Sequence, residues 1–147
     1  YAVVDGRVYL SVHHDCQRSD YCKAVIYMNF VYVAIGGALG AMLRYSLNYL
    51  PVSTAFPFKT LIANIFGSFI IGMIAGVADI KGVDDRLSLL LKVGFCGGFT
   101  TFSTYSLETV TLIEKGDWGV AVIYAATSVI VCVLSCVAGI TLAKYIV

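Results

Sequence analysis

Long apolar stretches alternate with short polar connections along the chain, and this alternation repeats four times. The apolar stretches cover about residues 25–50, 58–80, 88–114 and 118–143. A membrane-spanning helix needs about 20 predominantly apolar residues, so each stretch is long enough to cross a bilayer. The pattern therefore predicts an all-α membrane protein with four transmembrane helices.

The third apolar stretch contains residues that disfavour a continuous helix. Gly97 and Gly98 are followed by a run of hydroxyl residues, namely Thr100, Thr101, Ser103 and Thr104. Each glycine costs about 1 kcal/mol relative to alanine in a helix interior, and Ser and Thr compete for backbone hydrogen bonds. Irregular backbone at membrane depth is tolerated where protein or an ion satisfies its carbonyls. We therefore expect a third helix that is broken at its centre and lines a pore or a binding site.

Polar side chains recur at helical spacing in the stretches on either side of this break. They are Thr60, Asn64 and Ser68 in the second stretch and Tyr124, Ser128 and Cys132 in the fourth. Residues four apart share one face of a helix. An interhelical hydrogen bond would be enough to explain an asparagine in a membrane. Because the break lies nearby, we favour a role for Asn64 as a donor that lines a pore.

Composition excludes several classes of protein. Of the 147 residues, 59% are hydrophobic and 13% are charged, which is too apolar for a soluble domain. The net charge of +1 gives no electrostatic reason to expect a nucleic-acid partner. No pair of cysteines has metal-ligand spacing, and none of the four stretches contains a histidine, so an intramembrane enzyme lacks the residues it would need.

The first 27 residues differ from the rest of the chain. Their charges are scattered without helical periodicity, and Met28 would be a natural start. We interpret residues 1–27 as a polar tail, a leader remnant or a start assigned too far upstream, and residues 28–147 as a four-helix transmembrane domain. Within the first stretch, Gly36 and Gly40 form a motif that allows close helix packing. Arg44 follows, either as an interfacial snorkelling side chain or as a charge that attracts anions at a vestibule.

The positive charges give almost no bias for one orientation in the membrane. Four lie on one expected side and three on the other: Lys81, Arg86, Lys92 and Lys144 against Arg44, Lys59 and Lys115. Lys/Arg bias sets orientation, so we expect insertion both ways up and an antiparallel homodimer with its two-fold axis in the membrane plane. Two broken helices meeting at that axis would present backbone carbonyls to a monovalent cation such as Na⁺, because divalent ions usually require carboxylates.

Three motifs on three successive stretches carry a specific resemblance. They are Gly-Gly-x-x-Gly-Ala-x-x-Arg-Tyr at 36–45, Thr-Leu-x-x-Asn-x-x-Gly-Ser at 60–68 and Gly-Phe-x-Gly-Gly-Phe-Thr-Thr-Phe-Ser-Thr at 94–104. In this order and spacing they resemble the Fluc fluoride channels, the CrcB family, over residues 28–147. Members of that family are dual-topology antiparallel homodimers of four-span subunits, with two fluoride pores and a central Na⁺. The resemblance implies passive export of fluoride across the inner (plasma) membrane and hence fluoride resistance.

The resemblance also implies roles for individual residues. It places the structural Na⁺ on the backbone carbonyls of Gly97 and Thr100. It assigns the fluoride pore to Arg44, Thr60, Asn64, Phe102, Ser103, Thr104, Tyr105, Tyr124 and Ser128. Two positions depart from the family pattern, because Tyr105 stands where a second Phe is usual and Cys132 where Ser is frequent. These departures put the conduction rate in doubt, but not the selectivity.

The sequence leaves two other functions open. A small dual-topology proton-coupled multidrug antiporter would also have four spans, but it needs a carboxylate in its first span. Residues 25–50 contain no Asp or Glu. A structural subunit would need only the packing glycines, and it would leave the polar stripes unexplained.

Overall fold

The computed structural model describes residues 20–51 and 54–147 of the chain. Most of the expected polar tail, residues 1–19, therefore lies outside the described residues. The first described helix, α2 (Asp20–Ser46), begins within the expected tail, so residues 20–27 are helical. A short helix η1 (Leu47–Tyr49) follows it.

The described residues are helical throughout, apart from the connections. After η1 come α3 (Phe58–Lys81), α4 (Asp85–Ser88), η2 (Leu89–Cys96), α5 (Gly97–Phe99), α6 (Phe102–Glu114) and α7 (Trp118–Ile146). Three helices within the described part are long and apolar enough to cross a membrane, at Lys23–Tyr49, Phe58–Lys81 and Trp118–Ile146. The third predicted stretch corresponds to the consecutive shorter segments α4 to α6.

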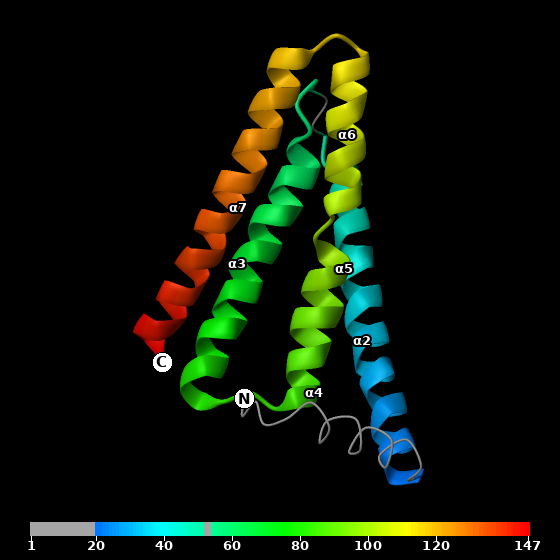
Figure 1. Cartoon of the computed structure of the whole chain (residues 1–147), viewed down its shortest axis with the longest axis vertical. Coiled ribbons are helices and arrows are strands. Elements are labelled where there is room, and N and C mark those ends of the chain that lie inside the picture. The colour runs from blue at the N-terminus through cyan, green and yellow to red at the C-terminus, as the bar shows by residue number, and fades with distance from the viewer. Residues whose placement is uncertain (1–19, 52–53) are drawn as a thin grey trace, which may run out of the picture.

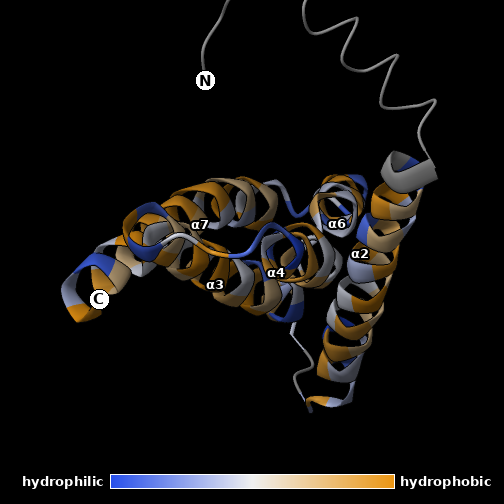
Figure 2. Cartoon of the chain, turned by 90° about the horizontal axis from the view of Figure 1, so that it is seen from below, coloured by the Kyte–Doolittle hydropathy of each residue, from blue (hydrophilic) through white to orange (hydrophobic). Residues whose placement is uncertain are grey.

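The long helices lie in a row, with the segmented stretch between two of them. α3 and α7 pack side by side, and α2 packs against η2 and α5 (Figure 1). Apolar residues make up most of the long helices, whereas polar residues gather towards the helix ends and α4 (Figure 2). Large side chains such as Phe30, Phe66 and Val133 are exposed on these helices. Lipid or another apolar protein surface is the environment that suits such exposure.

Glycines allow α2 to lie directly on the backbone of the segmented stretch. A Cβ atom at Gly36 would overlap the carbonyl oxygen of Leu90, and one at Gly40 would overlap that of Phe95. Only a residue without a side chain permits this approach. The Gly36–Gly40 motif therefore sets the distance between α2 and the residues that precede the interruption.

The helical path is interrupted between α5 and α6. Thr100 has φ −79° and ψ 158°, and Thr101 has φ −151° and ψ 116°, so both residues are extended. Helical geometry resumes at Phe102. The interruption begins two residues after the Gly97–Gly98 pair, which itself lies in α5, and its hydrogen bonds belong to the candidate site.

Candidate functional site

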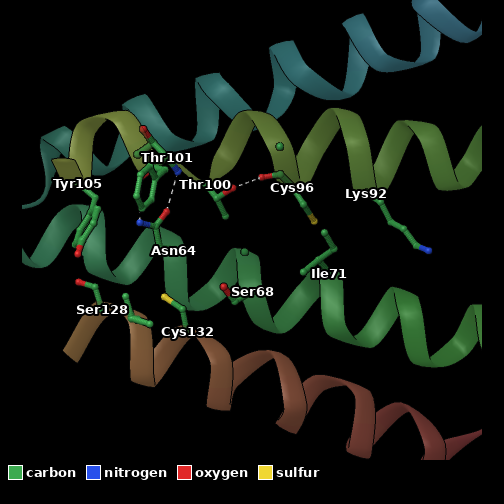
Figure 3. A pocket seen from close by; sticks show the side chains of 14 residues that line it. Asn64, Ser68, Ile71, Lys92, Cys96, Thr100, Thr101, Tyr105, Ser128 and Cys132 are labelled. Atoms are coloured by element: carbon green, nitrogen blue, oxygen red, sulfur yellow. Dashed lines mark hydrogen bonds between the residues drawn. The ribbon is translucent and has the colours of Figure 1, made fainter. Parts of the chain in front are cut away.

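A cavity of about 330 Å³ lies between α3, α7 and the segmented stretch, beside the interruption. Figure 3 shows Tyr105 at one end of this first cavity and Lys92 at the other, with Asn64, Ser68, Ser128 and Cys132 between them. Its remaining lining residues are Gly67, Ile71, Cys96, Gly97, Thr100, Thr101, Phe102 and Val129. The wall is therefore mostly apolar. Its polar groups are neutral apart from Lys92, and no carboxylate lines it among the residues that the structure describes.

A second cavity of about 290 Å³ lies on the other side of the interruption, between α2, η1, α3 and α6. Its charged lining residues are Arg44, Lys59 and Glu108, and Thr60 and Thr104 contribute hydroxyls. Thr101 lines both cavities. The extended residue at the interruption therefore forms part of the partition between the two spaces.

The side chain of Asn64 holds the interrupted backbone in place. The N–H of Thr101 donates to Asn64 Oδ1 at 2.8 Å, and Asn64 Nδ2 donates to the carbonyl oxygen of Thr101 at 3.1 Å. The buried backbone N–H and carbonyl of Thr101 therefore both have a hydrogen-bond partner, as buried backbone groups require, and one side chain supplies both partners. A primary amide has a second N–H and further lone pairs, so Asn64 can still present a donor to the first cavity.

Thr101 also caps α6. Its Oγ1 accepts a hydrogen bond from the N–H of Thr104 at 3.1 Å, which is the usual arrangement at a helix N-terminus. The same oxygen lies 3.0 Å from Thr104 Oγ1 and 3.3 Å from Ser103 Oγ. The hydroxyl residues that disfavour a continuous third helix therefore also cap the start of α6.

Glu108 joins two residues from the predicted polar stripes. Thr60 Oγ1 donates to Glu108 Oε1 at 2.8 Å, and the Tyr124 hydroxyl donates to Glu108 Oε2 at 2.7 Å. Thr60 and Tyr124 are buried. Sequence reasoning did not assign Glu108 to the site, although an acidic residue within an apolar stretch is itself a signal of function.

Three aromatic rings form a continuous series next to the interruption. The ring centroids of Phe102 and Tyr105 are 5.3 Å apart, as are those of Tyr105 and Tyr124. Phe102 is 76% exposed, so the rest of the chain leaves most of its side chain uncovered. Tyr105 is half-buried, and its hydroxyl lies 3.5 Å from the carbonyl oxygen of Ala125.

The residues of each predicted polar stripe do not all face the same space. Asn64 and Ser68 line the first cavity, whereas Thr60 lines the second. Ser128 and Cys132 line the first cavity, while Tyr124 is enclosed beside Glu108. Ser128 is 6% exposed, and its Oγ has no hydrogen-bond partner within the described part of the chain.

The remaining predicted residues are spread around the interruption. Arg44 and Thr104 line the second cavity, and Arg44 Nε is buried without a partner among the described residues. Ser103 is exposed and lines neither cavity described here. Gly97 and Thr100 both line the first cavity. The described residues contain no group of three or more His, Cys, Asp or Glu side chains that could hold a metal.

Comparison with known proteins decides the family. Residues 31–140 match the model of the family described as CrcB-like protein, Camphor Resistance (CrcB). This chain belongs to the CrcB family. The match covers the three motifs. It includes most of α2 and α7, and all of α3 and the segmented stretch.

Curated relatives match almost the full membrane domain. The fluoride-specific ion channel FluC of Magnetococcus marinus is 41% identical over 123 residues, which cover 81% of this chain and 100% of that protein. The fluoride-specific ion channel FluC 2 of Nitrobacter hamburgensis is 38% identical over 123 residues, which cover 81% of this chain and 99% of that protein. The FluC of Novosphingobium aromaticivorans is 44% identical over 104 residues, 67% of this chain and 82% of that protein.

Membership of this family and the apolar helices together make the chain a multi-pass membrane protein. The relatives' names describe ion channels rather than enzymes. No catalytic role is therefore assigned to the hydroxyls, thiols or carboxylate around the interruption.

Proposed function

We propose that this protein is a fluoride channel of the plasma membrane, which lets F⁻ leave the cell passively and so gives resistance to fluoride. The observation that carries the proposal is the wall of the first cavity, where neutral hydrogen-bond donors and aromatic rings gather beside an interrupted helix. The names of the curated relatives support fluoride as the permeant ion.

A wall of this chemistry suits a small anion that holds its hydration water strongly. The hydroxyl of Ser128, the free N–H of Asn64 and the ring edges of Phe102 and Tyr105 offer partial positive charge. Several weak sites in series allow an ion to bind and then to leave. A carboxylate in the same wall would repel the ion, and none lines the first cavity among the described residues.

The hydrogen bonds around the interruption support a structural Na⁺ on the carbonyls of Gly97 and Thr100. In a continuous α-helix these oxygens would accept from the N–H groups of Thr101 and Thr104. Those N–H groups instead donate to Asn64 Oδ1 and Thr101 Oγ1. The carbonyls of Gly97 and Thr100 therefore lack the N–H donors that a continuous helix would give them. A hard monovalent cation is a suitable partner for such neutral backbone oxygens.

The functional unit of the proposal is an antiparallel homodimer in which all four stretches of each subunit cross the membrane. Gly97 is exposed, and a Cβ built on it would meet no atom within 4 Å in the protomer. Phe102 is exposed as well. A second, inverted copy at this face would cover both residues, bring two sets of freed carbonyls to one Na⁺, and complete two pores.

Flux measurements on liposomes that contain the purified protein test the function. We expect efflux of F⁻ driven by its own gradient, with no dependence on nucleotide or on a proton gradient, and little efflux of Cl⁻. Phe102→Ile should reduce the efflux while the dimer survives. Failure of F⁻ to leave, together with uptake of a cationic dye driven by a proton gradient, would refute the channel and support a multidrug antiporter.

A further inference from the structure

Lys92 occupies the end of the first cavity that lies farthest from Tyr105. It projects from η2, its side chain is half-buried, and it lines the cavity (Figure 3). It is the cavity's only charged lining residue within the described part of the chain. The end near Lys92 is therefore electropositive, and the rest of the wall is neutral.

No carboxylate neutralises Lys92 among the described residues. Neither a hydrogen bond nor an ion pair of its ammonium is found there. The nearest acidic residues in the chain are Asp84 and Asp85, and Asp84 uses Oδ1 to accept from the N–H groups of Arg86 and Leu87 at the start of α4. Asp85 is exposed at the helix end. The charge of Lys92 thus acts on the cavity without compensation.

An uncompensated charge at the end of an apolar-walled cleft concentrates oppositely charged ions there, because field lines are focused by the low-dielectric wall. The groups beyond it are those that can accept an arriving anion: the hydroxyl of Ser68 and the buried, unpartnered hydroxyl of Ser128. Because Lys92 lies at the end of the cavity and not beside Asn64, its charge would attract an anion without holding the anion at the interruption.

We propose that Lys92 is the residue that draws the anion into the first cavity, and that it sets the rate of capture without setting the selectivity. This inference rests on the proposed channel function. It gives the first cavity its own cation at the η2 end, separate from Arg44, which lines the second cavity. A long-range electrostatic effect of this kind weakens as salt screens the charge.

Single-channel currents in planar bilayers test this role. For Lys92→Gln we expect a fluoride current about threefold lower than wild type at an ionic strength of about 10 mM. The difference should disappear at about 1 M of a large impermeant salt, where the Debye length falls to about 3 Å. Lys92→Arg should retain the wild-type current, and Lys92→Glu should fall below Lys92→Gln. The preference for F⁻ over Cl⁻ should stay the same in every variant.

Lys81→Gln provides the matched control, because Lys81 is an exposed lysine at the same end of the molecule and lines neither cavity. It should conduct as wild type does at both salt concentrations. Equal currents in Lys92→Gln and wild type at low salt would overturn the inference. So would a loss that salt does not change and that Lys92→Arg does not restore, because such a loss indicates a packing role. Absence of fluoride current in the wild-type protein would instead refute the proposed function itself.

Discussion

Asn64 links two features that are far apart in the chain, the polar stripe of α3 and the interruption between α5 and α6. Its amide satisfies both backbone groups of Thr101, across a separation of 37 residues. In the proposed channel, this residue would contribute in two ways. It presents a donor to the first cavity, and it keeps Thr101 extended so that the carbonyl of Gly97 stays free of its helical donor.

Replacement of Asn64 by alanine removes both hydrogen bonds and leaves the buried backbone of Thr101 without partners. We expect a loss of about 2 kcal/mol in stability and a reduced fluoride flux. Thermal unfolding in detergent and liposome efflux measure the two effects. Asn29→Ala is the control, since Asn29 lines neither cavity. Unchanged flux and unchanged stability in Asn64→Ala would remove Asn64 from both roles.

Glu108 is a second residue whose importance depends on its partners. Glu108→Ala leaves the buried hydroxyls of Thr60 and Tyr124 without an acceptor, at a cost of about 1–3 kcal/mol for each group. Tyr124→Phe removes one of these hydrogen bonds together with its donor, so we expect a smaller loss of about 1 kcal/mol. Scanning fluorimetry of the purified protein measures both values.

Glu114→Ala serves as the comparison for Glu108→Ala, because Glu114 is an exposed acid at the end of the same helix. It should unfold at nearly the wild-type temperature. If Glu108→Ala and Glu114→Ala had the same effect, the hydrogen bonds to Thr60 and Tyr124 would contribute nothing measurable.

At the scale of the elements, the spacing between α2 and the segmented stretch depends on glycine. Gly40→Ala adds one methyl group where the carbonyl oxygen of Phe95 already lies. The atom in the way belongs to the backbone, so the helices must move apart. We expect a lower unfolding temperature and reduced flux, measured by scanning fluorimetry and liposome efflux.

Gly119→Ala, in the first turn of α7, is the matched substitution. A Cβ atom at Gly119 would meet no atom within 4 Å, and alanine favours a helix over glycine by about 1 kcal/mol. We therefore expect Gly119→Ala to be neutral or stabilising. Equal destabilisation in the two variants would show that close packing at Gly40 is not the cause.

For the whole molecule, the near balance of positive charges predicts insertion in both orientations. Glu114→Lys with Asp117→Lys adds two positive charges at the end that carries Lys115, and Asp79→Lys with Asp85→Lys adds two at the opposite end. Each double variant should insert one way only, because Lys/Arg bias sets orientation. Reporter fusions at the C-terminus measure the orientation in cells.

If the channel is an antiparallel dimer, each double variant alone should lose fluoride flux, and co-expression of the two should restore it. Full activity of one singly oriented variant expressed by itself would exclude the antiparallel assembly. Together with flux in the wild-type protein, that result would leave the channel function intact and change only the arrangement of its subunits.

Several features of this protein can be predicted from local composition alone. Apolar length indicated a membrane protein, the Gly97–Gly98 pair and the hydroxyl run located the interruption to within a few residues, and three motifs identified the family. These features could be read from neighbouring residues because helix propensity and transfer into lipid act over short segments of chain. Four spans, dual topology and a structural Na⁺ stay predictions.

The pairing of the polar groups, by contrast, depends on how the helices pack. Asn64 pairs with Thr101 across 37 residues, and Glu108 meets Thr60 across 48 and Tyr124 across 16. The same packing divided each predicted stripe between different surroundings and placed Lys92 at the end of a cavity. Spacing along one helix defines a face, but the partner of that face depends on how the helices pack, which no local pattern in the chain contains.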